Sequence, residues 1–286
     1  MSEITLKRYQ DIVEKELKEV MNELTVDSNL KVSMIYALLD GGKRLRPLLF
    51  LSLLESFGVD YHKYVRVACA IEMIHTYSLV HDDLPGMDND TLRRGKPTTH
   101  IRFNEATAIL CGDALLTDAF YVLTNLALDD GIIVKLIRAL SYAAGSSGMV
   151  YGQQLDLEEE AAANIKYSED VYHYKTAMML QASIVMATII IGNESTDFIN
   201  LGSYLGQAFQ IQDDILEVCS SSAKIGKDID SDARNQKVTI VSLLGIKKAQ
   251  ALVDDYFNKI DTILINNNLK DSFFNEVINM ISKREK

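Results

Sequence analysis

The chain has 286 residues, 48% of them hydrophobic, with 15 glycines, three prolines and no tryptophan. This is ample apolar material for one large core, which fits one domain or two tightly fused halves; we expect a single domain that spans residues 1–286. The formal net charge of −11 argues against nucleic acid as a general partner, because an acidic surface repels phosphate backbones.

The cysteines and the apolar runs favour a protein of the reducing cytoplasm. The three cysteines are widely spaced and lie in apolar helical patterns, so they indicate neither a disulfide framework nor a metal-ligand pair. The first residues mix charged and apolar side chains and do not resemble a signal peptide. The most apolar run, residues 182–192, is only about half of the roughly 20 residues that span a bilayer. We expect a buried core helix there and no transmembrane segment.

Scarce proline and long stretches without turn residues predict an all-α protein. The first predicted helix covers residues 4–24, where apolar side chains recur at helical spacing and the charges face away. A second helix is expected over residues 30–39. After a short basic segment, Pro47 is expected to begin the next helix, residues 48–57, at its first position.

The basic segment reads Gly41-Gly42-Lys43-Arg44-Leu45-Arg46-Pro47. The glycines permit close backbone approach, while Lys43 and Arg46 can point into a shared space. That arrangement suits an anion such as diphosphate. A helix end with a glycine stop signal and basic residues that complement the dipole explains the segment equally well.

The helix expected over residues 61–83 ends in an unusual group of carboxylates. Asp82 and Asp83 face the negative end of the helix dipole and have no lysine or arginine four residues earlier. Pro85 cannot continue the helix, so we expect the chain to bend and bring Asp88 back towards them. The three carboxylates can then converge on one cation.

Three basic or titratable residues accompany this motif. His75 shares a helical stripe with Asp82, about 10 Å away at ~1.5 Å per residue, although a lone histidine is more often an ordinary core or surface residue. Arg93 and Arg94 follow the motif closely. Such opposite charges can simply neutralise each other. If a metal occupies the aspartates, the arginines become available to hold phosphate oxygens.

The middle of the chain predicts further helices over residues 104–127 and 132–150, followed by glycines that suggest close helix approach or a bend. Ser168 is expected to begin a helix that runs to Gly192. Within it, Lys175 and Thr176 interrupt an apolar run. A buried lysine needs a partner.

A second carboxylate cluster lies on the helix expected over residues 196–219. Gln210, Asp213, Asp214 and Glu217 fall on one helical stripe, because they differ by three, four and seven positions. Oxygen ligands without histidine or cysteine indicate Mg²⁺ or a similar hard ion rather than zinc. Two lysines follow beyond this helix, Lys227 and Lys237.

Taken in order, these motifs resemble those of the short-chain trans-prenyl diphosphate synthases, most closely the bacterial farnesyl diphosphate synthases. The resemblance extends nearly from end to end. It rests on the basic segment 41–47, the aspartate motif 82–88 with Leu92-Arg93-Arg94-Gly95, and the motif 213–217 after Phe209-Gln210. Other residues at matching positions are His75, Lys175-Thr176, Lys227 and Lys237.

The resemblance implies an isoprenoid synthase fold, a helical bundle around a deep central cavity, in which the two aspartate motifs hold three Mg²⁺ ions that Mn²⁺ can replace. The implied metal ligands are Asp82, Asp83, Asp88, Asp213, Asp214 and Glu217, the last where the family usually has Asp. The allylic diphosphate is expected to be held by Arg93, Lys175 and Lys227, with Lys237 a further substrate-binding residue. Isopentenyl diphosphate is expected at Lys43, Arg46, His75 and Arg94. An allylic carbocation would be stabilised by the Lys175 carbonyl, the Thr176 hydroxyl and the Gln210 amide.

Product length is expected to depend on Tyr77 and its neighbour Ser78, because Tyr77 lies about one and a half turns deeper than Asp82. An aromatic ring there can act as a floor, although an ordinary core tyrosine is equally consistent with the sequence. We therefore expect condensation of isopentenyl diphosphate with dimethylallyl or geranyl diphosphate to (2E,6E)-farnesyl diphosphate. The alternative is the twenty-carbon geranylgeranyl diphosphate.

Two other classes of protein are weighed against this function. A class I terpene cyclase would lack the basic segment that carries Lys43 and Arg46. A non-catalytic subunit of a heteromeric synthase need not keep its carboxylates, whereas this chain keeps all six. The resemblance also implies a homodimer.

Overall fold

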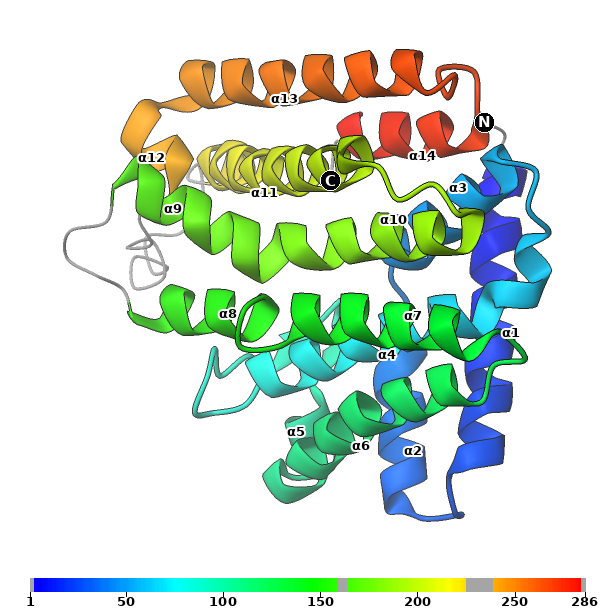
Figure 1. Ribbon diagram of the computed structural model, residues 1–286. Coiled ribbons are helices and arrows are strands. Elements are labelled where there is room, and N and C mark those ends of the chain that lie inside the picture. The colour runs from blue at the N-terminus through cyan, green and yellow to red at the C-terminus, as the bar shows by residue number, and fades with distance from the viewer. Residues whose placement is uncertain (1–2, 159–163, 225–238, 284–286) are drawn as a thin grey trace. The chain divides into compact units, whose positions relative to one another are not determined.

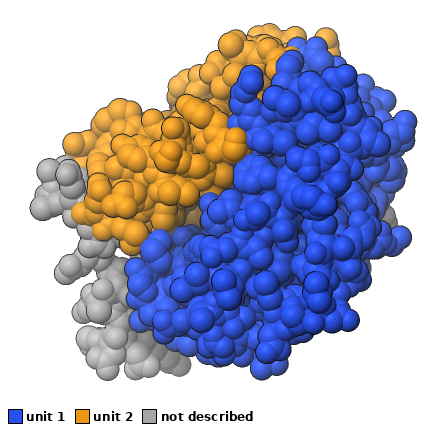
Figure 2. All heavy atoms as spheres, turned by 60° about the horizontal axis from the view of Figure 1, so that its bottom comes forward, with its two compact units in different colours: residues 1–140, 186–193 blue, residues 141–185, 194–286 orange. Residues whose placement is uncertain are grey.

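The computed structural model of the protein describes residues 3–158, 164–224 and 239–283. Within these ranges nearly all regular structure is helical, so the all-α prediction is confirmed (Figure 1). The chain divides into two compact units, residues 1–140 with 186–193 and residues 141–185 with 194–286 (Figure 2).

Unit 1 consists of helices and one short antiparallel hairpin. In chain order its elements are α1 (Glu3–Leu24), α2 (Asn29–Leu38), α3 (Leu45–Ser56), the 3-10 helix η1 (Tyr61–Tyr64), α4 (Val65–Asp82), strands β1 (Leu92–Arg93) and β2 (Lys96–Pro97), α5 (Thr99–Arg102), α6 (Glu105–Thr124) and most of α7 (Asp130–Ala144).

Helix α4 is the centre of unit 1 because it is apolar on almost every face. It packs against α1, α2, α3 and α6. Its side chains Val67, Ile71 and Ile74 are fully buried, and each such burial stabilises the fold by roughly 1.5–3 kcal/mol. Several residues of the predicted stripe of α1 are also buried, among them Tyr9 and Val13. The last turn of α4 is thereby fixed in place at the point where its aspartates begin.

The described residues of unit 2 form helices and the turns between them. In chain order they are α8 (Met149–Glu158), α9 (Ile165–Val171), the π-helix η2 (Tyr172–Ala177), α10 (Met178–Ile191), α11 (Thr196–Lys224), α12 (Ile240–Leu244), α13 (Ile246–Asn266) and α14 (Phe273–Ser282), with the C-terminal end of α10 assigned to unit 1. Helix α11 packs against η2, α12, α13 and α14. Buried aliphatic side chains such as Ile211, Ile240 and Val253 join α11, α12 and α13 in one apolar cluster.

The wide turn of η2 is closely contacted by two glycine-bearing helices. A Cβ added to Gly152 of α8 would lie 2.1 Å from the backbone nitrogen of Lys175, and one added to Gly206 of α11 would lie 2.2 Å from Cα of Ala177. Glycine is required at both positions for this approach. The expectation of close helix contact at Gly152 is therefore confirmed. Single π-helical turns occur frequently at functional sites, and this one carries Lys175 and Thr176.

Two predicted helix starts are wrong. Helix α3 begins at Leu45, so Pro47 is its third residue; proline is accepted there because the N–H groups of the first turn have no intrahelical partner. Helix α9 begins at Ile165, and Asn164 caps it by accepting from the Tyr167 N–H over 3.1 Å. Ser168 is instead a buried residue inside the helix.

The helix predicted over residues 132–150 is two helices, because the chain turns at residues 145–148 between α7 and α8. Among the described residues, two helical stretches are long and apolar enough to cross a membrane by length and composition, residues 105–124 and 165–191. Of the most apolar window in the second stretch, 61% is buried inside the protein, as expected for a core helix. Neither is a clear membrane span.

Candidate active site

The basic segment forms a tight loop between α2 and α3 in which left-handed backbone is concentrated. Gly41 and Gly42 have φ of +88° and +112°, and Arg44 has φ of +52°. Glycine takes up such conformations without steric cost, whereas an L-residue does not. The glycines therefore allow the chain to reverse within a few residues and begin α3.

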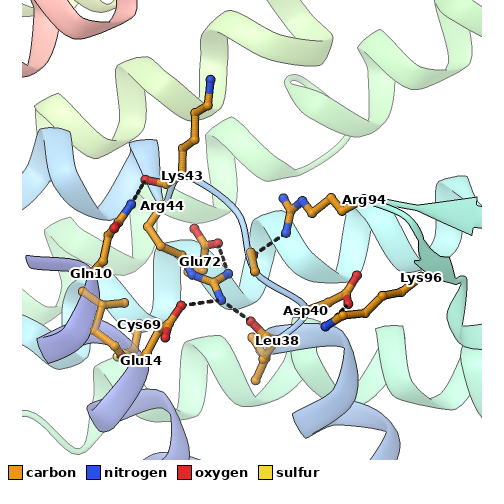
Figure 3. A network of polar contacts seen from close by, with 12 residues as sticks. Gln10, Glu14, Leu38, Asp40, Lys43, Arg44, Cys69, Glu72, Arg94 and Lys96 are labelled. Atoms are coloured by element: carbon orange, nitrogen blue, oxygen red, sulfur yellow. Dashed lines mark hydrogen bonds and ion pairs between the residues drawn. The ribbon is translucent and has the colours of Figure 1, made fainter. Parts of the chain in front are cut away.

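The side chain of Arg44 anchors this loop from beneath (Figure 3). It is buried, and its Nη1 donates to Oε1 of Glu72 over 2.8 Å while Nη2 donates to the Leu38 carbonyl over 2.6 Å. Glu14 lies 3.4 Å from the same guanidinium. Both terminal nitrogens of Arg44 thus bind the protein itself, while its buried Nε has no hydrogen-bond partner among the described residues. Its neighbours in the motif differ from it in burial. Lys43 is exposed and Arg46 is half-buried.

The β1–β2 hairpin docks on this loop through polar contacts (Figure 3). Nη1 of Arg94 donates to the Gly41 carbonyl, and Lys96 pairs with Asp40 over 2.9 Å. The hydroxyl of Tyr36 donates to the Pro97 carbonyl over 2.6 Å. The two segments that sequence analysis assigned to diphosphate binding therefore meet within unit 1.

Positive charge collects where the loop, the hairpin and α4 meet. Burial lowers the pKa of Arg46 to about 10, which Glu72 partly opposes and Arg94 reinforces. Burial also lowers the pKa of His75 well below its ordinary value, and the charges of Arg46 and Arg94 lower it further. The buried Nε of Arg46 makes no hydrogen bond within the described part of the chain. An anion at this point would relieve the repulsion and satisfy that donor.

The first aspartate motif bends as predicted. Helix α4 ends at Asp82, and the N–H of Asp88 donates to the Asp82 carbonyl over 2.8 Å, which closes the turn that contains Pro85. The Asp82 side chain is partly exposed and that of Asp88 is exposed.

Asp83 is neutralised by a neighbouring arginine, which is one of the two outcomes that the sequence left open. It is buried, and Arg93 donates to its Oδ1 from Nε over 2.9 Å and from Nη2 over 2.6 Å. Burial raises the pKa of Asp83, and the Arg93 guanidinium opposes that rise. Within the described residues, no three acidic, histidine or cysteine side chains lie together closely enough to hold a metal ion as they stand.

The residues expected to measure product length lie one to two turns before Asp82. Tyr77 is buried, and its ring meets the His81 ring edge-on with centroids 5.8 Å apart. Burial raises the pKa of Tyr77 to about 12, with a smaller contribution from the Asp82 carboxylate. The hydroxyl of Ser78 donates to the His75 carbonyl over 2.9 Å.

In unit 2 the second aspartate motif is connected to η2 and α12. Asp214 is buried and accepts a hydrogen bond from the Tyr172 hydroxyl, which in turn accepts from the Ile240 N–H over 3.1 Å. The Gln210 amide lies 3.4 Å from Asp214, and the Thr176 hydroxyl donates to Gln210 over 2.9 Å. These contacts bring Thr176, Gln210 and Asp214 into one polar group. Asp213 is half-buried and Glu217 is exposed on the same helix.

Lys175 has the partner that its apolar surroundings require. Its Nζ lies 2.6 Å from Oδ2 of Asp156 on α8, and both side chains are largely covered. Lys227 and Lys237 lie outside the described residues.

Three residues of these networks were not singled out from the sequence: Glu72, Asp156 and Tyr172. For Glu72 a signal existed, since a lone carboxylate inside an apolar helix must be paired, and for Asp156 the matching signal was the unpaired lysine of the next segment. Tyr172 gave none, because a tyrosine at the edge of an apolar run is ordinary core composition.

Comparison with known proteins identifies the family. Residues 27–278 match the family model described as polyprenyl synthetase. The farnesyl diphosphate synthase of Micrococcus luteus is 47% identical over 252 residues, which cover 85% of this chain and 87% of that one. The chain belongs to the polyprenyl synthetase family.

Other members of the polyprenyl synthetase family agree in sequence and fold. A geranylgeranyl diphosphate synthase of Cyanophora paradoxa is 41% identical over 236 residues, 78% of each chain. The solved structure of a Helicobacter pylori geranyltransferase complexed with magnesium and isoprenyl diphosphate superposes with a TM-score of 0.79 at 34% identity, covering 98% of this chain and 97% of that one. The isoprenoid synthase fold implied by the sequence is therefore confirmed.

Proposed function

We propose that this protein is a prenyltransferase that condenses isopentenyl diphosphate with dimethylallyl or geranyl diphosphate to give (2E,6E)-farnesyl diphosphate and diphosphate. The observation that carries the proposal is the cationic group of Arg46, Arg94 and His75, in which Arg46 has an unpaired buried donor. The family relatives named farnesyl diphosphate synthase support it independently.

Isopentenyl diphosphate is assigned to the loop and hairpin of unit 1. Arg46 and Arg94 supply guanidinium forks that match phosphate oxygens, and exposed Lys43 adds a flexible charge. His75, kept neutral by burial and by the arginines, can donate one hydrogen bond and takes up a proton more readily once an anion arrives. This substrate therefore needs no metal in the proposal.

The allylic diphosphate is assigned to the aspartate motifs with Mg²⁺, which Mn²⁺ can replace. The donor set fits a hard cation, since carboxylate oxygens are the ligands that Mg²⁺ prefers and the Asp88 side chain is exposed. Three bound Mg²⁺ ions would neutralise the negative charge that develops on the leaving diphosphate. We propose these ligands: Asp82, Asp83, Asp88, Asp213, Asp214 and Glu217.

The protein's own residues position and stabilise the reacting groups. Arg93 and Lys175 now pair with Asp83 and Asp156, and in the proposal they turn to diphosphate oxygens, with Lys227 and Lys237 as further ligands. Cleavage of the allylic carbon–oxygen bond leaves a carbocation. Neutral dipoles stabilise it without capturing it, and the proposed dipoles are the Lys175 carbonyl, the Thr176 hydroxyl and the Gln210 amide. The isopentenyl double bond attacks, and a proton passes to the departing diphosphate.

The ligand assignment is tested by Asp82→Ala. We expect turnover with Mg²⁺ to fall by several orders of magnitude, because a ligand of the leaving group is removed. Asp255→Ala is the control, since Asp255 is a 56% exposed partner of Lys259 on α13. Full Mg²⁺-dependent activity of the Asp82 variant would contradict the assignment.

The fifteen-carbon product is tested at Tyr77. We propose that its buried ring, supported by His81 and next to Ser78, forms the floor under the growing chain. Tyr77→Ala should give twenty-carbon or longer products, whereas Tyr77→Phe keeps the ring and should keep the fifteen-carbon product. Chromatography of the dephosphorylated products distinguishes them. A wild-type product longer than fifteen carbons would favour a geranylgeranyl diphosphate synthase, the second candidate.

We also propose a cytoplasmic homodimer. Large apolar side chains on α5 and α6 are exposed, among them Ile101, Ile109, Leu110 and Tyr121, and we propose that some of them meet a second copy of the chain. A turnover assay on the purified chain alone, with its mass in solution, separates an active homodimer from a non-catalytic subunit of a heteromeric synthase. The basic segment argues against a class I terpene cyclase.

A further inference from the structure

The guanidinium of Arg94 lies directly against the backbone of the glycine loop. Its Nη1 donates to the Gly41 carbonyl, and Figure 3 shows the side chain extended from the hairpin to the loop. A Cβ added to Gly42 would lie 2.6 Å from Nη1, 2.7 Å from Cζ and 2.8 Å from Nη2 of Arg94. Three guanidinium atoms at nearly equal distance mean that the face of the guanidinium, and not one end of it, covers the Gly42 Cα.

Gly41 is a matched contrast one residue earlier. Both glycines have positive φ, +88° for Gly41 and +112° for Gly42, so an alanine at either position is strained by the backbone. A Cβ at Gly41 meets no atom within 4 Å, however. Backbone conformation therefore favours glycine at both positions, whereas only at position 42 is glycine also needed to leave room for the Arg94 side chain.

We propose that Gly42 is a positioning residue for isopentenyl diphosphate, because its missing side chain lets the Arg94 guanidinium lie flat on the loop with its remaining N–H groups directed at the substrate. The inference rests on the proposed function. A guanidinium holds phosphate through two parallel N–H bonds, so tilting its plane weakens both. Any side chain at position 42 must tilt or displace it.

A side chain at position 42 should displace Arg94 without unfolding the loop. The atoms it would strike are the far end of a flexible side chain, and Arg94 is exposed on a surface hairpin. The loop keeps its other anchors, Arg44 on Glu72 and Lys96 on Asp40. The remaining cost is the strain of positive φ, which Gly41→Ala shares.

The test measures binding of isopentenyl diphosphate to the full-length protein by isothermal titration calorimetry without Mg²⁺. Loss of a charge-assisted hydrogen-bonding pair raises Kd by roughly 10- to 100-fold. We expect this increase in Kd for Gly42→Ala and a several-fold smaller increase for Gly41→Ala. The KM of Gly42→Ala for geranyl diphosphate should change no more than that of Gly41→Ala does. Thermal unfolding of both variants should agree within a few degrees.

A double-mutant cycle decides whether Gly42 acts through Arg94. In an Arg94→Ala background, Gly42→Ala should weaken binding no more than Gly41→Ala does, because the group it displaces is absent. Equal Kd values for the two glycine variants in the wild-type background, or an undiminished Gly42 effect without Arg94, would overturn the inference while leaving the proposed function intact. Failure of the wild-type protein both to bind isopentenyl diphosphate and to turn over would overturn the proposed function itself.

Discussion

The buried pair of Arg44 and Glu72 makes a quantitative prediction about what holds the basic segment in place. Their side chains are 1% and 3% exposed, and their closest atoms are 2.8 Å apart. Glu72→Ala removes the main counter-charge of a guanidinium that cannot reach water. Removing one partner of a buried pair costs about 3–5 kcal/mol. We expect about 3 kcal/mol, the lower end, because Arg44 keeps the Leu38 carbonyl and Glu14.

Thermal unfolding followed by circular dichroism measures this loss. About 3 kcal/mol lowers Tm by roughly 6–12 °C in a chain of this size. Glu14→Ala is the control, since Glu14 is 38% exposed and 3.4 Å from Arg44, and such exposed pairs contribute at most about 1 kcal/mol. Equal decreases in Tm for Glu72→Ala and Glu14→Ala would refute the claim that burial makes the Glu72 ion pair the stronger one.

Three further predictions concern single groups. The pKa of His75 is depressed in the folded protein, so below about pH 6.5 the unfolded chain gains a proton that the folded one does not. As the pH is lowered from 7 to 5, the free energy of unfolding should therefore decrease, by up to ~1.4 kcal/mol per pH unit below about pH 6.5. Urea titrations at pH 7 and pH 5 measure this decrease, which should be smaller in His75→Gln. Tyr172→Phe removes the hydroxyl bound to buried Asp214 and should lower the urea-derived stability by about 1–3 kcal/mol. Asp156→Asn weakens the anchoring of Lys175 and should reduce kcat/KM for geranyl diphosphate by about tenfold, leaving the calorimetric Kd of isopentenyl diphosphate unchanged.

The sequence predicted the helices well where apolar periodicity was strong and their ends less well. Helix α1 follows its predicted range closely, and the helix predicted over residues 61–83 is formed by the 3-10 helix η1 followed by α4. The start of α9 was misplaced because Ser168, Glu169 and Asp170 look like a cap, whereas the actual cap is Asn164. The π-helical turn at Tyr172–Ala177 gave no sequence signal, since it depends on the close approach of α8 and α11 to that turn.

In the candidate site, the bend of the first aspartate motif was predictable from the sequence, whereas the pairing of its charges was not. The bend after Asp82 follows from Pro85 and was confirmed by the Asp88 hydrogen bond. The sequence left open whether Arg93 would neutralise an aspartate or stay available, and the fold pairs it with Asp83. That outcome depends on how deeply Asp83 is buried, which local sequence does not determine.

The ion pairs of this protein differ in how deeply they are buried, and this difference indicates which pairs only stabilise the fold and which can be replaced by a ligand. Arg44 and Glu72 are both within a few per cent of complete burial, so no substrate or metal can replace either partner. Arg93 with Asp83, and Lys175 with Asp156, each keep a basic group that is 25–29% exposed. These two basic groups are therefore the ones that could leave their carboxylates for a diphosphate, as the proposed function requires. Adjacent basic residues of one motif thus differ in role: the buried Arg44 secures the loop, whereas exposed Lys43 and half-buried Arg46 are assigned to the substrate in the function we propose.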